Sequence, residues 1–193
     1  MEETRPDSTP ISERKKPKIT TPFIATLIGV LIMVIALFLP YMTAVGDMAE
    51  YIEKYPDRVE IESLEMTASD LANVPVISVS NIITGVYGED DGQIANIIVI
   101  VFCGCLALTA LLAILKKPIA VMIFDLLTGG VFFFLNFLMK EDFISADKYA
   151  WGIGYYAILI AAIAIFAEAI WLLVTKVSLK REAKRLAKAN TME

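Results

Sequence analysis

Two acidic residues, Asp125 and Glu168, lie inside otherwise apolar stretches of the chain and are the residues best placed to do chemistry. Each is seven residues from one end of its stretch, and a helix rises about 1.5 Å per residue. If both stretches cross a membrane, the two carboxyls lie roughly 10 Å inside the same boundary. Three threonines are expected near them in a shared polar layer: Thr26, Thr109 and Thr128.

A carboxyl group at that depth is unfavourable when it is charged and unpaired, and two neighbouring carboxyls would share a proton. This chemistry suits a proton- or cation-coupled site. The structural alternative is that each acid stays neutral or bonds to a threonine, fixing the register of the helices, or that Glu168 reaches Lys176 or Lys180. No lysine or arginine lies within the apolar stretches to neutralise the acids, so both interpretations stay open.

Spacing predicts which way the two acids face. Residues at intervals of three and four lie on one side of a helix, and small residues in membranes mark packing faces. The face that includes the first acid consists of Asp125, Gly129, Phe132 and Asn136. The face that includes the second consists of Gly154, Ala157, Ala161, Ala164, Glu168 and Trp171. Both acids are therefore predicted to point into the bundle.

Several kinds of site are excluded by composition. The chain has no histidine, which removes Ser-His-Asp triads, imidazole bases and histidine-rich zinc sites. Cys103 and Cys105 are two apart on a helix, point to different sides and cannot bond to each other. We therefore expect no enzyme activity, no cofactor, no metal site and no nucleic-acid partner.

The helices that position the two acids are predicted from the lengths of the apolar stretches. Hydrophobic residues make up 57% of the 193-residue chain, gathered in four blocks, and about 20 apolar residues span a bilayer. The predicted class is an all-α integral membrane protein, a bundle of four transmembrane helices. The predicted spans are 22–40, 94–115, 118–139 and 151–175, with residues 116–117 forming a tight turn between the second and third.

Basic residues predict the orientation. Thirteen lysines and arginines lie in the two terminal segments and the 116–117 turn, against four in residues 41–93 and 140–150. Because basic flanks stay in the cytoplasm, both termini are predicted inside and the other two segments outside. Residues 1–21 are expected to be a disordered tail and 176–193 a basic helical one. Anionic lipids would meet basic groups at this face: Lys116, Lys117, Lys180, Arg181, Lys184 and Arg185.

The first outer segment, 41–93, has about 53 residues and eleven acids against two bases. A loop of this length is expected to form a small folded unit. The pattern predicts a strand at 58–62 and a capped helical turn at Ser69–Leu71, and leaves 76–86 undecided between strand and helix. The acids indicate either a cationic partner or a solvated surface, with Glu89–Asp91 a natural start to a helix.

Four spans with both ends inside and a large first outer segment resemble claudin-type and tetraspanin-type proteins in topology only, because their tryptophan-rich and paired-cysteine signatures are absent. We expect a non-enzymatic interaction or assembly component that displays its acidic segment to a membrane or extracytoplasmic protein, or to a second copy. The alternative is a proton- or cation-coupled transporter or channel using Asp125 and Glu168. Absence of disulfides and glycosylation sequons favours a bacterial plasma membrane.

Overall fold

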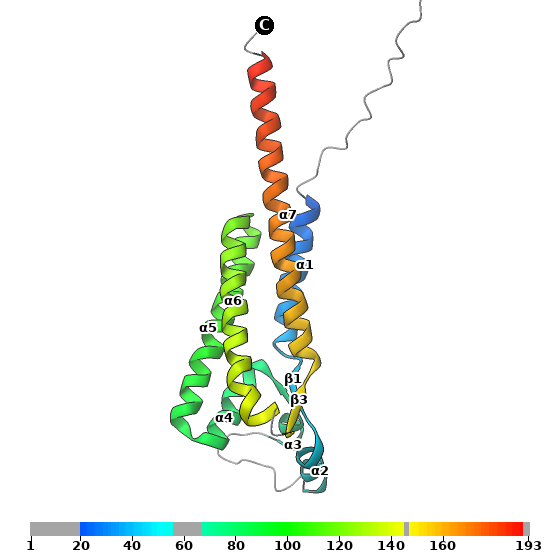
Figure 1. Ribbon diagram of the computed structural model, residues 1–193, viewed down its shortest axis with the longest axis vertical. Coiled ribbons are helices and arrows are strands. Elements are labelled where there is room, and N and C mark those ends of the chain that lie inside the picture. The colour runs from blue at the N-terminus through cyan, green and yellow to red at the C-terminus, as the bar shows by residue number, and fades with distance from the viewer. Residues whose placement is uncertain (1–19, 56–66, 145–146, 191–193) are drawn as a thin grey trace, which may run out of the picture.

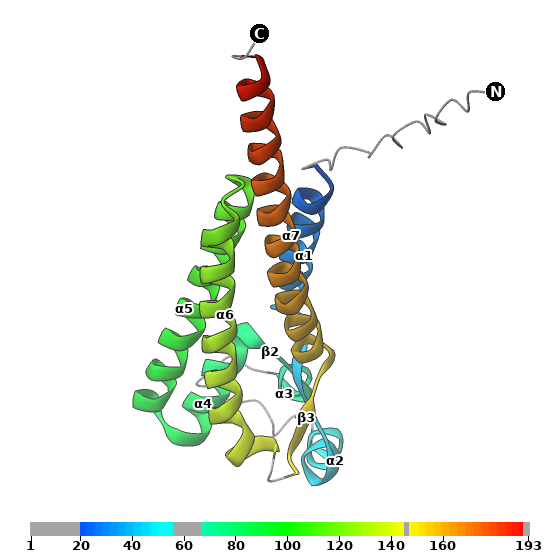
Figure 2. The same ribbon diagram turned by 45° about the horizontal axis from the view of Figure 1, so that its top comes forward.

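The computed structural model describes residues 20–55, 67–144 and 147–190 and shows a mostly helical protein. Four long helices run lengthwise: α1 (Thr20–Ala36), α5 (Glu89–Ile114), α6 (Pro118–Met139) and α7 (Ile153–Asn190). Helix α1 packs along α7, and α5 packs along α6 (Figure 1). The two pairs meet through α6 and α7 and diverge toward the end that carries the strands (Figure 2).

Three helices in the described part of the chain are long and apolar enough to cross a membrane: Glu89–Ile114, Pro118–Met139 and Ile153–Lys184. Helix α1 is apolar but has only 17 residues. Large apolar side chains on its outer side are nevertheless exposed: Ile24, Ile28, Leu31, Ile32 and Ile35. Exposed apolar faces of this extent are typical of membrane proteins.

The first long helix ends earlier than predicted. Residues 22–40 were expected to form one span, whereas α1 ends at Ala36 and Pro40 opens strand β1 (Pro40–Ala44). Between them, the amides of residues 37–39 donate to carbonyls three residues back, at 3.1 to 3.3 Å, which tightens the helix end. Pro40 has no amide hydrogen and keeps the preceding residue extended, so the chain leaves the helix as a strand.

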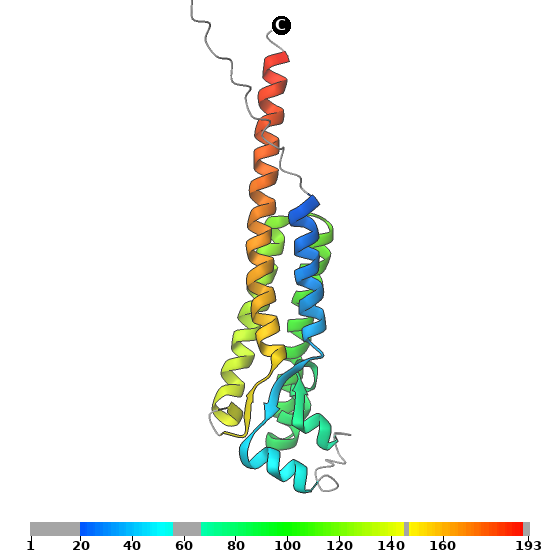
Figure 3. The same cartoon turned by 90° about the vertical axis from the view of Figure 1, so that its right-hand side faces the viewer.

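The two segments predicted to lie outside, 41–93 and 140–150, meet in one three-stranded antiparallel sheet, which the sequence did not predict. Strand β1 lies between β2 (Asn73–Pro75) and β3 (Tyr149–Trp151). The registers pair Met42 with Val74 on one side and with Trp151 on the other. The sheet therefore joins the start of α7 to the end of α1, which lie side by side in Figure 3.

We call the sheet and the short helices beside it the outer unit, after the side on which the sequence predicts them. These helices are α2 (Gly46–Lys54), α3 (Ala68–Ala72), the 3-10 turn η3 (Val76–Ser78) and α4 (Val79–Tyr87). A short π-helix, η4 (Lys140–Ile144), leads from α6 to β3. The predicted helical turn is confirmed in α3, residues 76–86 are helical, and the strand predicted at 58–62 lies outside the described residues.

Helix α3 is held by a reciprocal cap. Thr67 Oγ1 accepts from the Asp70 amide at 3.3 Å, and the Asp70 carboxylate accepts from the Thr67 amide at 2.9 Å. Hydrogen bonds from the Thr67 amide and hydroxyl lower the pKa of Asp70 below its ordinary 3.8. The cap holds Leu71, which is buried and whose carbonyl accepts from the Tyr149 hydroxyl at 3.1 Å.

The cap should loosen in acid. Because the pKa of Asp70 is lowered by folding, its contribution is complete above 3.8 and is lost as the pH falls through the folded value. We expect hydrogen-exchange protection of the α3 amides, corrected for intrinsic rates, to fall over that range. A Thr67→Val variant should be less protected at neutral pH but should lose only part of the pH dependence, because its backbone amide, the larger cause of the lowered pKa, still donates to Asp70. Asp70→Asn should remove the pH dependence, and an acid response that persists in Asp70→Asn would contradict the cap as its cause.

A turn stands at each end of α5. Gly88, at φ 100°, joins α4 to α5, which starts at Glu89 rather than at the predicted 94 because Glu89–Asp91 favour its first turn. At the other end, the Lys116 amide donates to the Ala113 carbonyl and the Lys117 amide to the Leu112 carbonyl, with Lys116 at φ 53°. These bonds close α5 before α6 begins at Pro118.

Candidate functional site

Asp125 lies on the buried side of α6. Burial recurs there at intervals of three and four through Val121, Asp125, Thr128 and Phe132. Only 4% of Asp125 is exposed, and its Oδ1 has no hydrogen-bond partner among the described residues. Asp125 therefore lies on the predicted face of the helix. Its Oδ1 is buried in apolar surroundings without the hydrogen bond that would offset the loss of its hydration.

Glu168 lies at the edge of the α7 face that packs on α1. A Cβ placed on Gly29 would lie 2.9 Å from Ile165 Cγ1, so the missing side chain of Gly29 leaves room for Ile165, and it would lie 3.6 Å from Glu168 Oε2, an ordinary contact distance. Its Oε2 is also buried without a partner in the described residues. The buried face of α7 is rotated from the predicted one, because Ile165 and Ala169, which were not predicted on it, are fully buried, whereas Trp171, which was, is 49% exposed.

The three predicted threonines are buried but bond within their own helices. Each hydroxyl donates to the carbonyl four residues earlier: Thr26 to Pro22 at 2.8 Å, Thr109 to Cys105 at 2.9 Å, and Thr128 to Phe124 at 2.8 Å. Their hydroxyl protons are used by the backbone. Within the described residues, none of them bonds to Asp125 or Glu168.

At the end of the bundle that carries the α5–α6 turn, Lys176 and Lys116 make contacts elsewhere than with Glu168. The Lys176 ammonium donates to the Lys116 carbonyl, and the Lys116 ammonium lies 4.7 Å from the centre of the Phe23 ring. The cation-π contact attaches the α5–α6 turn to α1, and the hydrogen bond attaches it to α7. Lys176 therefore closes the end of the bundle instead of neutralising the acid.

A cavity of about 290 Å³ lies between α6 and α7 and includes Asp125. All four long helices contribute to its lining, which is otherwise almost wholly apolar: Met33 of α1, Phe102 of α5, Phe132 of α6, and Ile158 and Phe166 of α7. Glu168 is not among the lining residues. Asp125 and Glu168 thus have different surroundings, a cavity for one and the α1 contact for the other.

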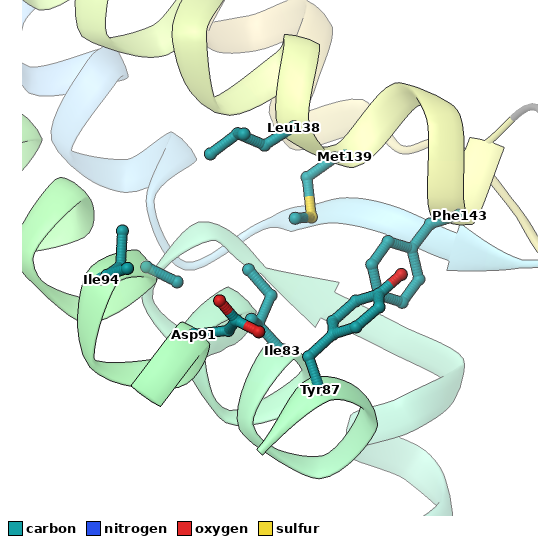
Figure 4. Close-up of a pocket in the computed structure, with 8 residues that line it drawn as sticks. Ile83, Tyr87, Asp91, Ile94, Leu138, Met139 and Phe143 are labelled. Atoms are coloured by element: carbon teal, nitrogen blue, oxygen red, sulfur yellow. The ribbon is translucent and has the colours of Figure 1, made fainter. Parts of the chain in front are cut away.

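A second cavity, of about 250 Å³, lies at the outer end between α4, α5 and α6. Figure 4 shows the rings of Tyr87 and Phe143 against each other, and their centres are 6.3 Å apart at 85°. Asp91 lines this cavity, but it is exposed at the start of α5. Of the two cavities, we regard the first as the stronger candidate site, because its acid is buried and has an oxygen without a partner in the described residues.

Sequence reasoning missed a buried hydrogen bond between Tyr41 and Asn136. The Tyr41 hydroxyl donates to Asn136 Oδ1, and Asn136 Nδ2 is buried without a partner in the described residues. The Tyr41 ring contacts three other rings, those of Phe132, Trp151 and Tyr155, at 5.4 to 6.2 Å between centres. The periodicity of α6 included Asn136, but no sequence signal named its partner 95 residues away.

Within the residues that the structure describes, no three His, Cys, Asp or Glu side chains gather closely enough to hold a metal ion. The candidate site therefore consists of one carboxyl in an apolar, aromatic cavity, which can pair with a cation or accept a hydrogen bond. No family model, curated protein or solved structure matches this chain.

Proposed function

We propose that the chain crosses a bacterial plasma membrane four times, with both termini in the cytoplasm. Three long apolar helices support this, together with the packing of α1 along α7 and the exposed apolar side of α1. Helix α1 spans about 25 Å at 1.5 Å per residue, and residues 37–39 extend it toward the outer boundary. The basic excess at the two ends and the α5–α6 turn supports the orientation.

Single-cysteine labelling in intact cells and in inverted membranes tests this topology. A membrane-impermeant maleimide should label a cysteine at Glu53 of α2 only in intact cells, and one at Lys117 only in inverted membranes. Both positions are exposed, and Cys103 and Cys105 are replaced by alanine for the experiment. Labelling of both positions from the same side would overturn the four-span arrangement.

Anionic lipid is the proposed partner at the cytoplasmic face. Helix α7 continues past the other helices to Asn190, and Lys180, Arg181 and Lys184 on this extension are exposed (Figure 1). Exposed Lys116 and Lys117 lie at the same end of the bundle, while the side chain of Arg185 lies outside the described part. Each basic residue near an anionic surface contributes about 1 kcal/mol of attraction.

The function we propose is non-enzymatic: an interaction or assembly component that presents its outer unit to a basic extracytoplasmic protein. The observation that carries this proposal is the surface of α2. Its three acids, Asp47, Glu50 and Glu53, are exposed, while Ile52 is buried against the outer unit. A folded unit fixed to the membrane helices by a sheet holds these charges in one place, which favours recognition over mere solvation.

Photocross-linking tests the assembly role. With a photoreactive residue at exposed Tyr51, we expect adducts to another protein whose yield falls several-fold in an Asp47→Asn, Glu50→Gln, Glu53→Gln variant. The matched control neutralises Glu89 and Asp90, which are exposed at the start of α5. An adduct only to a second copy would make the partner the chain itself. Adduct yields that do not depend on the α2 acids would contradict the proposal.

A proton- or cation-coupled transporter remains the second candidate. The buried, unpartnered oxygens Asp125 Oδ1 and Glu168 Oε2 favour it, since such groups in membranes commonly mark ion paths. Proteoliposomes with an internal pH dye should then show flux that Asp125→Asn and Glu168→Gln each abolish without loss of folding. Flux equal to that of empty liposomes, for protons and for alkali cations, would exclude this function.

A further inference from the structure

We propose that the cavity between α6 and α7 binds a small lipophilic ammonium compound that enters from the membrane and pairs with Asp125. This site lies apart from the outer unit and goes beyond the proposed assembly role. Asp125 is the acid in its lining, the other lining residues are almost all apolar, and its volume of about 290 Å³ suits a compact organic molecule.

The charge of the occupant follows from Asp125. The residue is 4% exposed, and its Oδ1 has no partner in the described residues, although a buried carboxyl oxygen needs a donor or a cation. The neighbouring threonine cannot donate, because the Thr128 hydroxyl already bonds to the Phe124 carbonyl at 2.8 Å. An ammonium group supplies both the missing hydrogen-bond donor and the opposite charge.

Aromatic walls favour the same class of ligand. Phe102, Phe132, Phe133 and Phe166 all line the cavity, and the Phe102 and Phe132 rings stack with their centres 6.1 Å apart. Ring faces attract organic cations, most strongly where water is excluded. A carboxyl among phenylalanine rings thus matches an ammonium on an apolar body better than an inorganic cation, for which the described lining offers few oxygen ligands.

Exposed residues in the cavity lining indicate how the ligand would enter. Leu126 of α6 and Ile163 of α7 line the cavity and are 69% and 64% exposed on the apolar surface of the bundle. Gly129 of α6 also lines the cavity, and a Cβ placed there would meet nothing within 4 Å. The site is therefore open sideways, so an apolar cation would reach it from the bilayer.

Binding of radiolabelled 1-aminoadamantane to the full chain in lipid nanodiscs tests the proposal, with empty nanodiscs subtracted. We expect saturable binding that weakens about tenfold or more in Asp125→Asn. Glu168→Gln, the matched acid outside the cavity, should bind as the unaltered chain does. 1-Adamantanol, which has the same cage and no charge, should bind unaltered chain and Asp125→Asn with similar weak affinity.

A second pair of variants keeps the test decisive if Asp125→Asn fails to fold. Gly129→Leu fills the open space and should abolish binding of both compounds. Gly130→Leu is the control, because Gly130 lines a separate groove against α5 and also has nothing within 4 Å of its Cβ position. No saturable binding of 1-aminoadamantane to the unaltered chain, or equal binding by Gly129→Leu, would overturn the proposal.

Discussion

Replacing Gly92 with alanine is expected to lower the free energy of unfolding by about 3 kcal/mol, a large effect for one methyl group. A Cβ on Gly92 would lie 1.8 Å from Thr84 Oγ1, 2.7 Å from Thr84 Cβ and 3.0 Å from Thr84 Cα. Rotating the threonine side chain cannot remove the overlap, because its Cβ is itself too close. Helices α4 and α5 would have to separate, which disturbs the outer unit. Thermal unfolding of purified protein in lipid measures the loss.

Thr84→Gly tests whether overlap with Thr84 causes the loss of stability in Gly92→Ala. Alone it should destabilise by about 1 kcal/mol, because glycine is a poor helix former. In the Gly92→Ala background it should stabilise, because it removes both Oγ1 and Cβ from the overlap. Gly104→Ala on α5 is the matched control, since nothing lies within 4 Å of its Cβ position. Additive effects of the Gly92 and Thr84 substitutions would show that the close approach is not responsible.

The second large effect is expected at Tyr41. Tyr41→Phe should cost about 2 kcal/mol, because Asn136 would lose the only donor that bonds its Oδ1 among the described residues while its Nδ2 is already unpartnered. Burial raises the pKa of Tyr41 well above its ordinary range, so the hydroxyl keeps its proton and remains the donor. The loss should therefore be the same at pH 6 and pH 9 in thermal unfolding.

Asn136→Leu in the Tyr41→Phe background should recover most of that loss. Replacing both partners of a buried hydrogen bond by apolar groups is far less costly than leaving one partner unsatisfied. Tyr155→Phe is the control, because Tyr155 belongs to the same aromatic cluster but does not bond to Asn136. A double variant less stable than Tyr41→Phe alone would mean that Asn136 stabilises the fold through other contacts.

Local features of the structure were predictable from the sequence. The apolar helices follow from composition over about 20 residues, and the helical turn of α3 follows from the pattern at Ser69–Leu71, although the residue that caps it is Thr67. The buried face of α6 followed from spacing, because each residue's direction on a helix depends only on its position. These properties depend on neighbours within one or two turns.

Only the tertiary structure determined which helix faces and side chains contact one another. The α7 face was predicted to include Trp171, but close packing of α1 through Gly29 rotates it toward Ile165. Asp125 and Glu168 were predicted as a pair, yet one lines a cavity and the other lies beside Gly29. The pairing of β1 with β3 and the Tyr41–Asn136 bond join segments about a hundred residues apart. Periodicity describes each helix by itself, whereas the rotation of one helix against another depends on side-chain shapes across the interface.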